Sequence, residues 1–208
     1  MTRADKGPAT VPSPLARLRE WLPMLMSVLA FTVSLTSLYY AALRDGQVIA
    51  MTGPMLLLSH DPLTGVGNVS VAVNLSNTGA RLVTVKQLQL QVTGPDGKTT
   101  VRLPAVAQQK LAADGEPKDD VMTAPITLAP RSETSRQLRF TITAKDAEHF
   151  AFVETGKYQF QLSLQLLDGQ REAEHWVLDL SETEAYQLTY WRGLNIGNTL
   201  AVLKAESP

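Results

Sequence analysis

One stretch of the chain, residues 22–43, constrains the rest because it runs for 22 residues without a formal charge. As an α-helix rising about 1.5 Å per residue it would reach roughly 33 Å, enough to cross a hydrocarbon core of about 30 Å. Charged residues bound it on both sides, with Arg19 and Glu20 before it and Arg44 after it. The stretch therefore predicts a membrane-spanning helix.

Basic residues are concentrated before this span. Only Arg44 carries a positive charge in the first 30 or so residues after it, and such a bias retains the N-terminus in the cytoplasm. We therefore expect a mobile cytoplasmic tail (1–20), a transmembrane helix (21–43) and an extracytoplasmic domain (44–208), periplasmic or extracellular, on the cell inner (plasma) membrane. The basic residues before the span are Arg3, Lys6, Arg17 and Arg19.

A cleaved signal peptide is the rival interpretation of the span. Signal peptides have an apolar region of about 7–15 residues followed by a small-x-small cleavage site. This apolar stretch is longer, and Tyr39, Tyr40 and Arg44 occupy the place where cleavage would fall. The pattern favours an uncleaved signal-anchor.

Small side chains recur along the span at spacings of 3, 4, 3 and 4, which places them on one helical face. Small residues let helices approach closely in lipid, so this face is a candidate contact with a second copy or with another membrane protein. The alternative is that the hydroxyl groups bond to their own helix. The candidate residues are Ser27, Ala30, Ser34, Ser37 and Ala41.

The composition excludes several classes of chemistry. The chain has no cysteine, which rules out disulfides, thiolate metal sites, cysteine nucleophiles and a lipoprotein anchor, and indicates an ordinary hydrophobic core in a bacterial envelope protein. It has 19 basic and 20 acidic residues, and this near balance gives no electrostatic case for binding nucleic acid.

After Arg44 the apolar residues alternate, a period typical of half-buried β-strands. A parity slip at Lys86–Gln87 predicts a bulge. Residues 144–153 could form two helical turns, and residues 200–203 a strand or one helical turn. The expected strands are 48–59, 68–76, 82–92, 99–103, 134–143, 156–167 and 171–180.

Seven such strands, with no long helix after the span, predict two antiparallel sheets packed face to face. The run Gly156-Lys157-Tyr158-Gln159-Phe160 resembles the tyrosine corner of immunoglobulin-like domains, with Tyr158 at the tyrosine position. The resemblance implies an all-β fold: an immunoglobulin-like antiparallel β-sandwich of the cysteine-free, fibronectin- or CARDB-like variety, preceded by one N-terminal transmembrane helix. The run from the span through residues 75–85 is also similar to small bacterial envelope proteins with a single span, which implies no activity.

Two segments stand out as candidate sites in the soluble part. Residues 104–124 are polar and lack a clear period, which predicts a long irregular loop, either functional or a tolerated insertion. The aromatic cluster Tyr186, Tyr190 and Trp191 could form an exposed adhesive strip or close the open end of the sandwich.

No catalytic, cofactor-binding or metal-binding set emerges from the sequence. His60, His149 and His175 are dispersed, which favours scattered surface histidines. Glu116, Asp119 and Asp120 have no calcium-loop spacing, and solvated acids are the better interpretation.

We therefore expect a non-enzymatic protein that presents a β-sandwich interaction domain outside the membrane. Its expected role is that of an accessory or assembly subunit of an envelope complex, with a protein partner or self-association and without nucleic acid. The alternative is an envelope enzyme or carbohydrate-binding module with its site in the 104–124 loop and the aromatic C-terminus.

Overall fold

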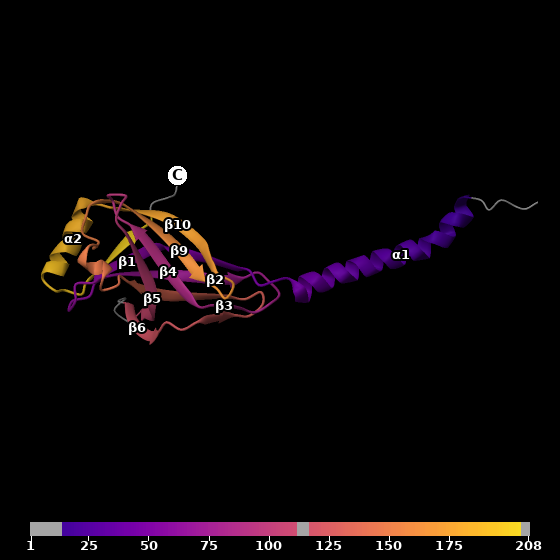
Figure 1. Cartoon of the computed structure of the whole chain (residues 1–208), viewed down its shortest axis with the longest axis horizontal. Helices are drawn as coiled ribbons and strands as arrows, with labels where there is room; N and C mark the ends of the chain where they lie inside the picture. Colours follow the sequence, from indigo (N-terminus) through magenta and orange to yellow (C-terminus); the bar gives the residue numbers. More distant parts are fainter. Residues whose placement is uncertain (1–13, 112–116, 205–208) are drawn as a thin grey trace, which may run out of the picture. The chain divides into compact units, whose positions relative to one another are not determined.

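The computed structural model describes residues 14–111 and 117–204, which belong to two compact units divided between Arg44 and Asp45 (Figure 1). The first unit is helical. Helix α1 (Pro14–Leu38) continues into one π-helical turn, η1 (Tyr39–Leu43). Its start lies within residues 1–20, which the sequence predicts as a mobile tail; residues 1–13 lie outside the described part. Residues Trp21–Leu43 are exposed throughout and are long and apolar enough to cross a membrane.

The second unit is mostly β-structure, as the sequence predicts. It also contains a 3-10 turn, η2 (Asp146–Glu148), and one α-helix, α2 (Glu182–Gly193). The strands are β1 (Val48–His60), β2 (Gly67–Asn77), β3 (Val83–Val85), β4 (Gln87–Thr93), β5 (Thr100–Leu111), β6 (Pro117–Met122), β7 (Ile126–Leu128), β8 (Glu133–Thr141), β9 (Gly156–Gln165), β10 (Gln170–Leu180) and β11 (Thr199–Leu203).

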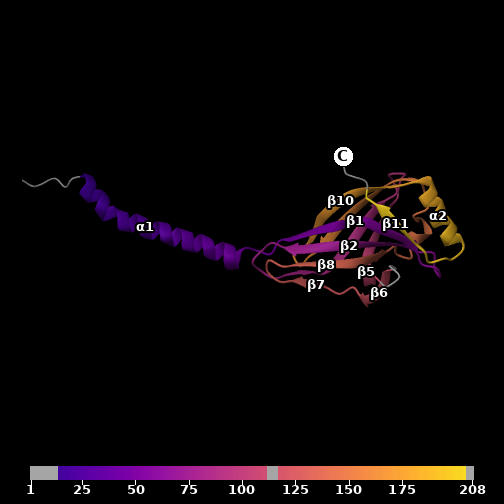
Figure 2. The same cartoon turned by 180° about the vertical axis from the view of Figure 1, so that it is seen from behind.

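Nine of these strands form one antiparallel sheet that curls into a half-barrel (Figures 1 and 2). Its order is β10-β9-β4-β5-β8-β2-β1-β11, with β6 beside β5, and β3 and β7 form a separate pair. The sequence predicts two separate sheets, whereas the structure has one large sheet in which strand β5 belongs to both halves. The structure thus confirms a predominantly β fold but not the sandwich type.

Strand β5 joins the two halves because it changes partner along its length. Its first residues pair with β4, and its later ones pair with β8 and β6. The register shifts between Ala105 and Ala107, and a bulge of this kind bends a strand and raises its twist. The bulge therefore marks the corner at which the sheet curls.

The core lies inside this curl and follows the alternation expected from the sequence. On β2, Val69, Val71, Val73 and Leu75 are buried, and they belong to the same core cluster as Tyr158, Phe160, Leu162 and Leu164 of β9. A fully buried aliphatic or aromatic side chain contributes about 1.5–3 kcal/mol, so these strands carry much of the unit's stability.

Three segments differ from the prediction. The parity slip at Lys86–Gln87 is not a bulge but the point where the chain leaves strand β3 for strand β4 in the other sheet. Most of the expected 104–124 loop is β-structure, because β5 continues to Leu111 and pairs with β6. Residues 112–116 lie outside the described part.

The third difference is helix α2, where no helix was expected. Ser181 caps it: its hydroxyl accepts from the Glu184 backbone N–H, and the Glu184 carboxylate accepts from the Ser181 N–H at 2.8 Å. Such a capping box satisfies N–H groups that the helix itself leaves free. Ala185 and Leu188 are buried, so α2 packs an apolar face on the core.

The curled sheet has β10 at one end of its strand order and β1 and β11 at the other. Among the described residues, no backbone pairing joins β10 to β1 or β11. Between β10 and β1, a side-chain cluster of Thr52, Glu174, Trp176 and Lys204 closes the gap. The Lys204 ammonium lies 2.7 Å from Glu174 Oε1 and also bonds to the Thr52 hydroxyl, while Glu174 Oε2 accepts from the Thr52 backbone N–H. We call this cluster the seam.

Candidate functional site

The five small residues predicted as a helix contact face lie on the first unit. Ser27, Ala30, Ser34 and Ser37 belong to α1 and Ala41 to η1, and all five are exposed. The neighbouring hydroxyls of Thr32 and Thr36 donate to carbonyls one turn back, at 2.8 Å. Bonding within the helix therefore occurs beside this face, and the contact face itself stays a prediction.

The predicted aromatic cluster lies on helix α2, where its members point in different directions. Tyr186 and Tyr190 are exposed, and their rings stack with centroids 6.3 Å apart. Trp191 is half-buried against the core. The cluster thus divides into an exposed tyrosine pair and a packing residue.

The histidines are not all on the surface. His149 and His175 are exposed, but His60 is 3% exposed, and neither of its ring nitrogens has a partner. Burial, and after it the positive charge of Arg192, lowers the pKa of His60 from 6.5 to about 4. The expectation of a surface residue is therefore wrong for His60. Within residues 14–111 and 117–204, no three His, Asp or Glu side chains are placed to hold a metal ion.

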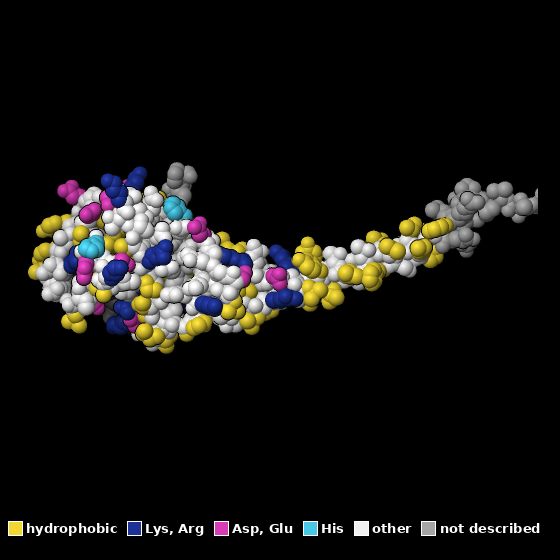
Figure 3. All heavy atoms as spheres, in the orientation of Figure 1, with side chains coloured by type: hydrophobic (Ala, Val, Ile, Leu, Met, Phe, Trp, Pro, Cys, Tyr) yellow, Lys and Arg dark blue, Asp and Glu magenta, His cyan; other side chains and the backbone are white. Residues whose placement is uncertain are grey.

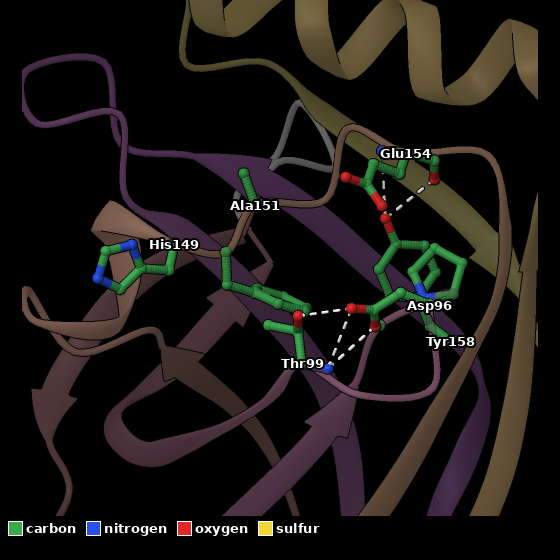
Figure 4. Close-up of a pocket in the computed structure, with 9 residues that line it drawn as sticks. Asp96, Thr99, His149, Ala151, Glu154 and Tyr158 are labelled. Atoms are coloured by element: carbon green, nitrogen blue, oxygen red, sulfur yellow. Dashed lines mark hydrogen bonds between the residues drawn. The ribbon is translucent and has the colours of Figure 1, made fainter.

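A small cavity of about 110 Å³ surrounds the predicted tyrosine corner (Figure 4). The Tyr158 hydroxyl donates to the Glu154 carbonyl at 2.9 Å and accepts from the Glu154 N–H at 3.2 Å, which is the backbone contact expected of such a corner. Burial raises the pKa of Tyr158 to about 12, so its hydroxyl stays protonated. Bonds from Thr99 hold the pKa of Asp96 below its usual value. Tyr158 and Asp96 therefore stabilise the surrounding turns.

A larger groove, of about 310 Å³, lies on the face of the sheet that points away from the core. Its floor is formed by side chains of β11, β1, β2, β8 and β5, and one wall comes from β6. The segments that follow β1 and precede β11 form the opposite wall, where a Cβ added at Gly197 would lie 3.4 Å from Pro62. We call this groove, with its lining residues Ser59, Asn68, Ser70, Gln109, Asp119 and Arg139, the polar groove.

The bulge in β5 is what brings Gln109 into the polar groove. Before the bulge Ala105 pairs with Phe140 of the core, whereas after it Ala107 pairs with Arg139, on the groove face. Asp119 then joins two residues, because its Oδ1 accepts from Gln109 Nε2 at 3.1 Å and its Oδ2 lies 2.8 Å from Arg139. Asp119 is exposed, as expected of a solvated acid, and it also forms an ion pair with Arg139.

The polar side chains that line the polar groove differ in how many hydrogen-bond partners they have. Asn68 Oδ1 already accepts from the Thr141 hydroxyl at 2.7 Å, but Gln109 Oε1 and Arg139 Nε are buried without a partner. Sequence reasoning missed this site: Asn68 and Ser70 alternate with core valines and so predict an exposed, solvated face. Asn68 and Ser70 are buried because β6 and the segments next to β1 and β11 lie on both sides of them.

Comparisons with known proteins leave the family undetermined. No protein-family model matches the sequence, and neither does any curated protein sequence. Among solved structures, a Bordetella pertussis protein assigned as ApaA shares 12% identity over 65% of this chain and 94% of its own, with a TM-score of 0.35. Spo0M, a sporulation control protein from Bacillus subtilis, shares 14% identity over 66% of this chain and 50% of its own (TM-score 0.35), and an Archaeoglobus fulgidus protein shares 10% over 79% and 99% (TM-score 0.32). At such scores these similarities say nothing of a shared function.

Proposed function

We propose that this protein is a non-enzymatic binding protein tethered to the cell inner membrane by one span. The observation that carries the proposal is the helix Trp21–Leu43, of which none is buried by the described chain. Leaving so much apolar surface in water costs about 25 cal/mol per Å², so lipid is its natural surrounding (Figure 3). In this proposal the N-terminus is cytoplasmic and the β unit is periplasmic or extracellular.

One end of the β unit carries exposed apolar side chains that a partner could cover. Strand β1 begins three residues after Asp45 and runs for 13 residues, which at about 3.3 Å each spans roughly 43 Å. Helix α2 lies at the far end of β1, where a Cβ on Gly65 would approach Arg192 within 3.5 Å. That end exposes Leu63, Tyr186, Tyr190 and Leu194. A protein partner or a second copy could cover these side chains as part of an envelope complex.

The immunoglobulin-like relationship is part of the same proposal. The Tyr158–Glu154 contact supports it locally, and the shared strand β5 gives the two halves of the sheet a sandwich-like arrangement. Domains of this architecture commonly serve as binding modules on cell surfaces.

Topology provides the first test. A reporter that is active only outside the cytoplasm, fused after Pro208, should be active, and the protein should resist extraction from membranes at alkaline pH. The same fusion lacking residues 1–43 is the control and should be inactive. An inactive full-length fusion, or release of the protein by alkali, would contradict the proposed anchor.

Partner binding is tested by photocrosslinking in intact cells. A crosslinking amino acid at Tyr186 or Tyr190 should give a discrete adduct, whether with another protein or with a second copy. Arg171 provides the control, because it lines a cavity with Asp45 and Gly46 at the other end of the unit. No adduct at either tyrosine, or equal adducts at Arg171, would argue against a contact surface at α2.

A further inference from the structure

The chain passes from the candidate span into the β unit almost without a linker. The span ends at Leu43, and Asp45, two residues later, already belongs to the β unit. Two residues reach at most about 7 Å, and the headgroup layer on one side of a bilayer is roughly 5–8 Å deep. With the span in lipid, as proposed above, Asp45 therefore lies in or beside the lipid headgroups, however the β unit is turned.

Asp45 and Gly46 pack closely against the turn between β2 and β3. A Cβ added at Gly46 would overlap the Val83 side chain, and one added at Gly79 would overlap the Asp45 carbonyl oxygen. In addition, Asp45 Oδ1 lies 3.1 Å from Arg81 Nη1. The first residues of the β unit thus hold this turn close to the point where the chain leaves the membrane.

Two exposed leucines lie beside Asp45, where all three residues line a cavity of about 250 Å³. Leu82, in the turn between β2 and β3, is 61% exposed, and Leu167, in the hairpin between β9 and β10, is 73% exposed. The Leu166 N–H donates to the Gly169 carbonyl at 2.8 Å, which closes that hairpin. Two separate turns therefore each present a large apolar side chain at this end, which we call the basal end.

The charged side chains that line the same cavity are paired with one another. Arg81 bonds to Asp45, and Arg171 lies 2.6 Å from Asp168, so the formal charges of these four residues cancel. Arginine can bury its apolar stem at a lipid interface while its guanidinium group stays among the headgroups. The basal end thus suits an apolar contact with lipid rather than attraction to lipid charge.

We infer that the basal end rests on the lipid surface, with Leu82 and Leu167 inserted among the headgroups. The inference rests on the proposed span, because the span is what places Asp45 at the membrane. Lipid is the occupant because a protein partner at this end would have to displace the headgroups around Asp45. The contact fixes the orientation of the β unit, which a single covalent connection would leave able to tilt.

The chain has no cysteine, so single labels can be introduced without removing native thiols. Leu82→Cys and Leu167→Cys would each carry an environment-sensitive fluorophore in the full-length protein, reconstituted into phosphatidylcholine vesicles. Both labels should emit at shorter wavelength than in water and should be quenched by lipids that carry a spin label near the headgroup. Leu63→Cys is the control, because Leu63 is 93% exposed and follows the other end of β1. Its label should not be quenched.

A second substitution connects the quenching to the leucines. Leu82→Asp, introduced into the Leu167→Cys protein, should reduce quenching of the label, because a carboxylate is costly at an apolar boundary. Leu63→Asp in the same protein is the matched control and should leave the quenching unchanged. Adding phosphatidylglycerol to the vesicles should also leave it unchanged, since the charges at the basal end cancel.

Flotation of the vesicles separates the two ways in which the inference can fail. A protein that does not float with the vesicles would overturn the anchor and this inference together. A protein that floats, but whose labels at Leu82 and Leu167 are quenched no more than the label at Leu63, would overturn this inference alone. Quenching that requires phosphatidylglycerol would do the same.

Discussion

The Lys204 ammonium lies 2.7 Å from a Glu174 carboxylate oxygen and 4.3 Å from the centroid of the Trp176 ring. The other carboxylate oxygen accepts from the Thr52 backbone N–H, and Lys204 also donates to the Thr52 carbonyl at 3.3 Å. Side chains thus satisfy both backbone groups of Thr52 where strand β1 has no neighbour on that side. An ion pair here replaces part of a strand ladder.

We expect Lys204→Met to destabilise the β unit by about 1–3 kcal/mol, because Glu174 would keep a partly buried charge without its cation. Urea unfolding followed by tryptophan fluorescence measures the change. The control is Arg171→Met, which removes an exposed ion pair with Asp168 and should cost less than about 1 kcal/mol. Equal effects of the two substitutions would mean that the seam adds no stability.

Removing the Tyr158 hydroxyl should also be measurable. Tyr158→Phe leaves the Glu154 N–H and carbonyl without their partner, so we expect a loss of about 1–2 kcal/mol in the free energy of unfolding. Tyr190→Phe, on the exposed face of α2, should change stability by less than about 0.5 kcal/mol. A Tyr158→Phe variant as stable as the wild type would show that the corner contact is replaceable by water.

Acid should weaken the fold through His60. Its pKa is about 4 when folded and near 6.5 when unfolded, so the unfolded chain binds more protons between these values and stability falls as pH drops through that window. The full effect is at most about 3 kcal/mol.

His60→Leu isolates this effect. Leucine continues the buried face of Leu56 and Leu58, and no hydrogen bond of the imidazole is lost. Stability measured from pH 7 to pH 4 should therefore fall less in the variant than in the wild type. Parallel pH curves for the two proteins would contradict a buried, neutral His60.

The small-residue face of the membrane span can be tested separately. Ser34→Leu enlarges the small-residue face and should weaken any association through it, while insertion is unaffected because leucine is favourable in a span. Crosslinking in membranes measures association, and Val33→Leu, one position away on the helix, is the control. If Ser34→Leu associates like Val33→Leu, the span acts as an anchor alone.

Much of the β-structure follows from the sequence, and the failures have physical causes. Valine alternation on β2 and aromatic alternation on β9 are strong signals, and Asp168–Gly169 forms the expected hairpin turn. Strand β5 was missed beyond Leu103 because its buried apolar positions there are Ala105 and Ala107, which have weak β propensity, and because Pro104 interrupts the pattern.

Helix α2 and the polar groove were missed for different reasons. The capping pair Ser181 and Glu184 was present as a helix-start signal, but only Ala185 and Leu188 of α2 are buried, too few for a clear helical period. The groove has no local signal at all, because the burial of Asn68 and Gln109 depends on elements distant in sequence. An alternating sequence pattern shows which face of a strand points to the core, but it does not show which other elements cover the opposite face.

The pairing of β1 with β11 also bears on when the unit can fold. Met55 pairs with Leu203 and Ser59 with Thr199. Strand β1, the first of the unit, therefore cannot complete its pairing on this side until β11, the last described strand, is present. Contacts this far apart in sequence slow folding, because a long loop must close before they form. During synthesis, β1 keeps an open edge until residue 203 has left the ribosome. A chain stalled before that point would offer this edge to chaperones or to neighbouring chains.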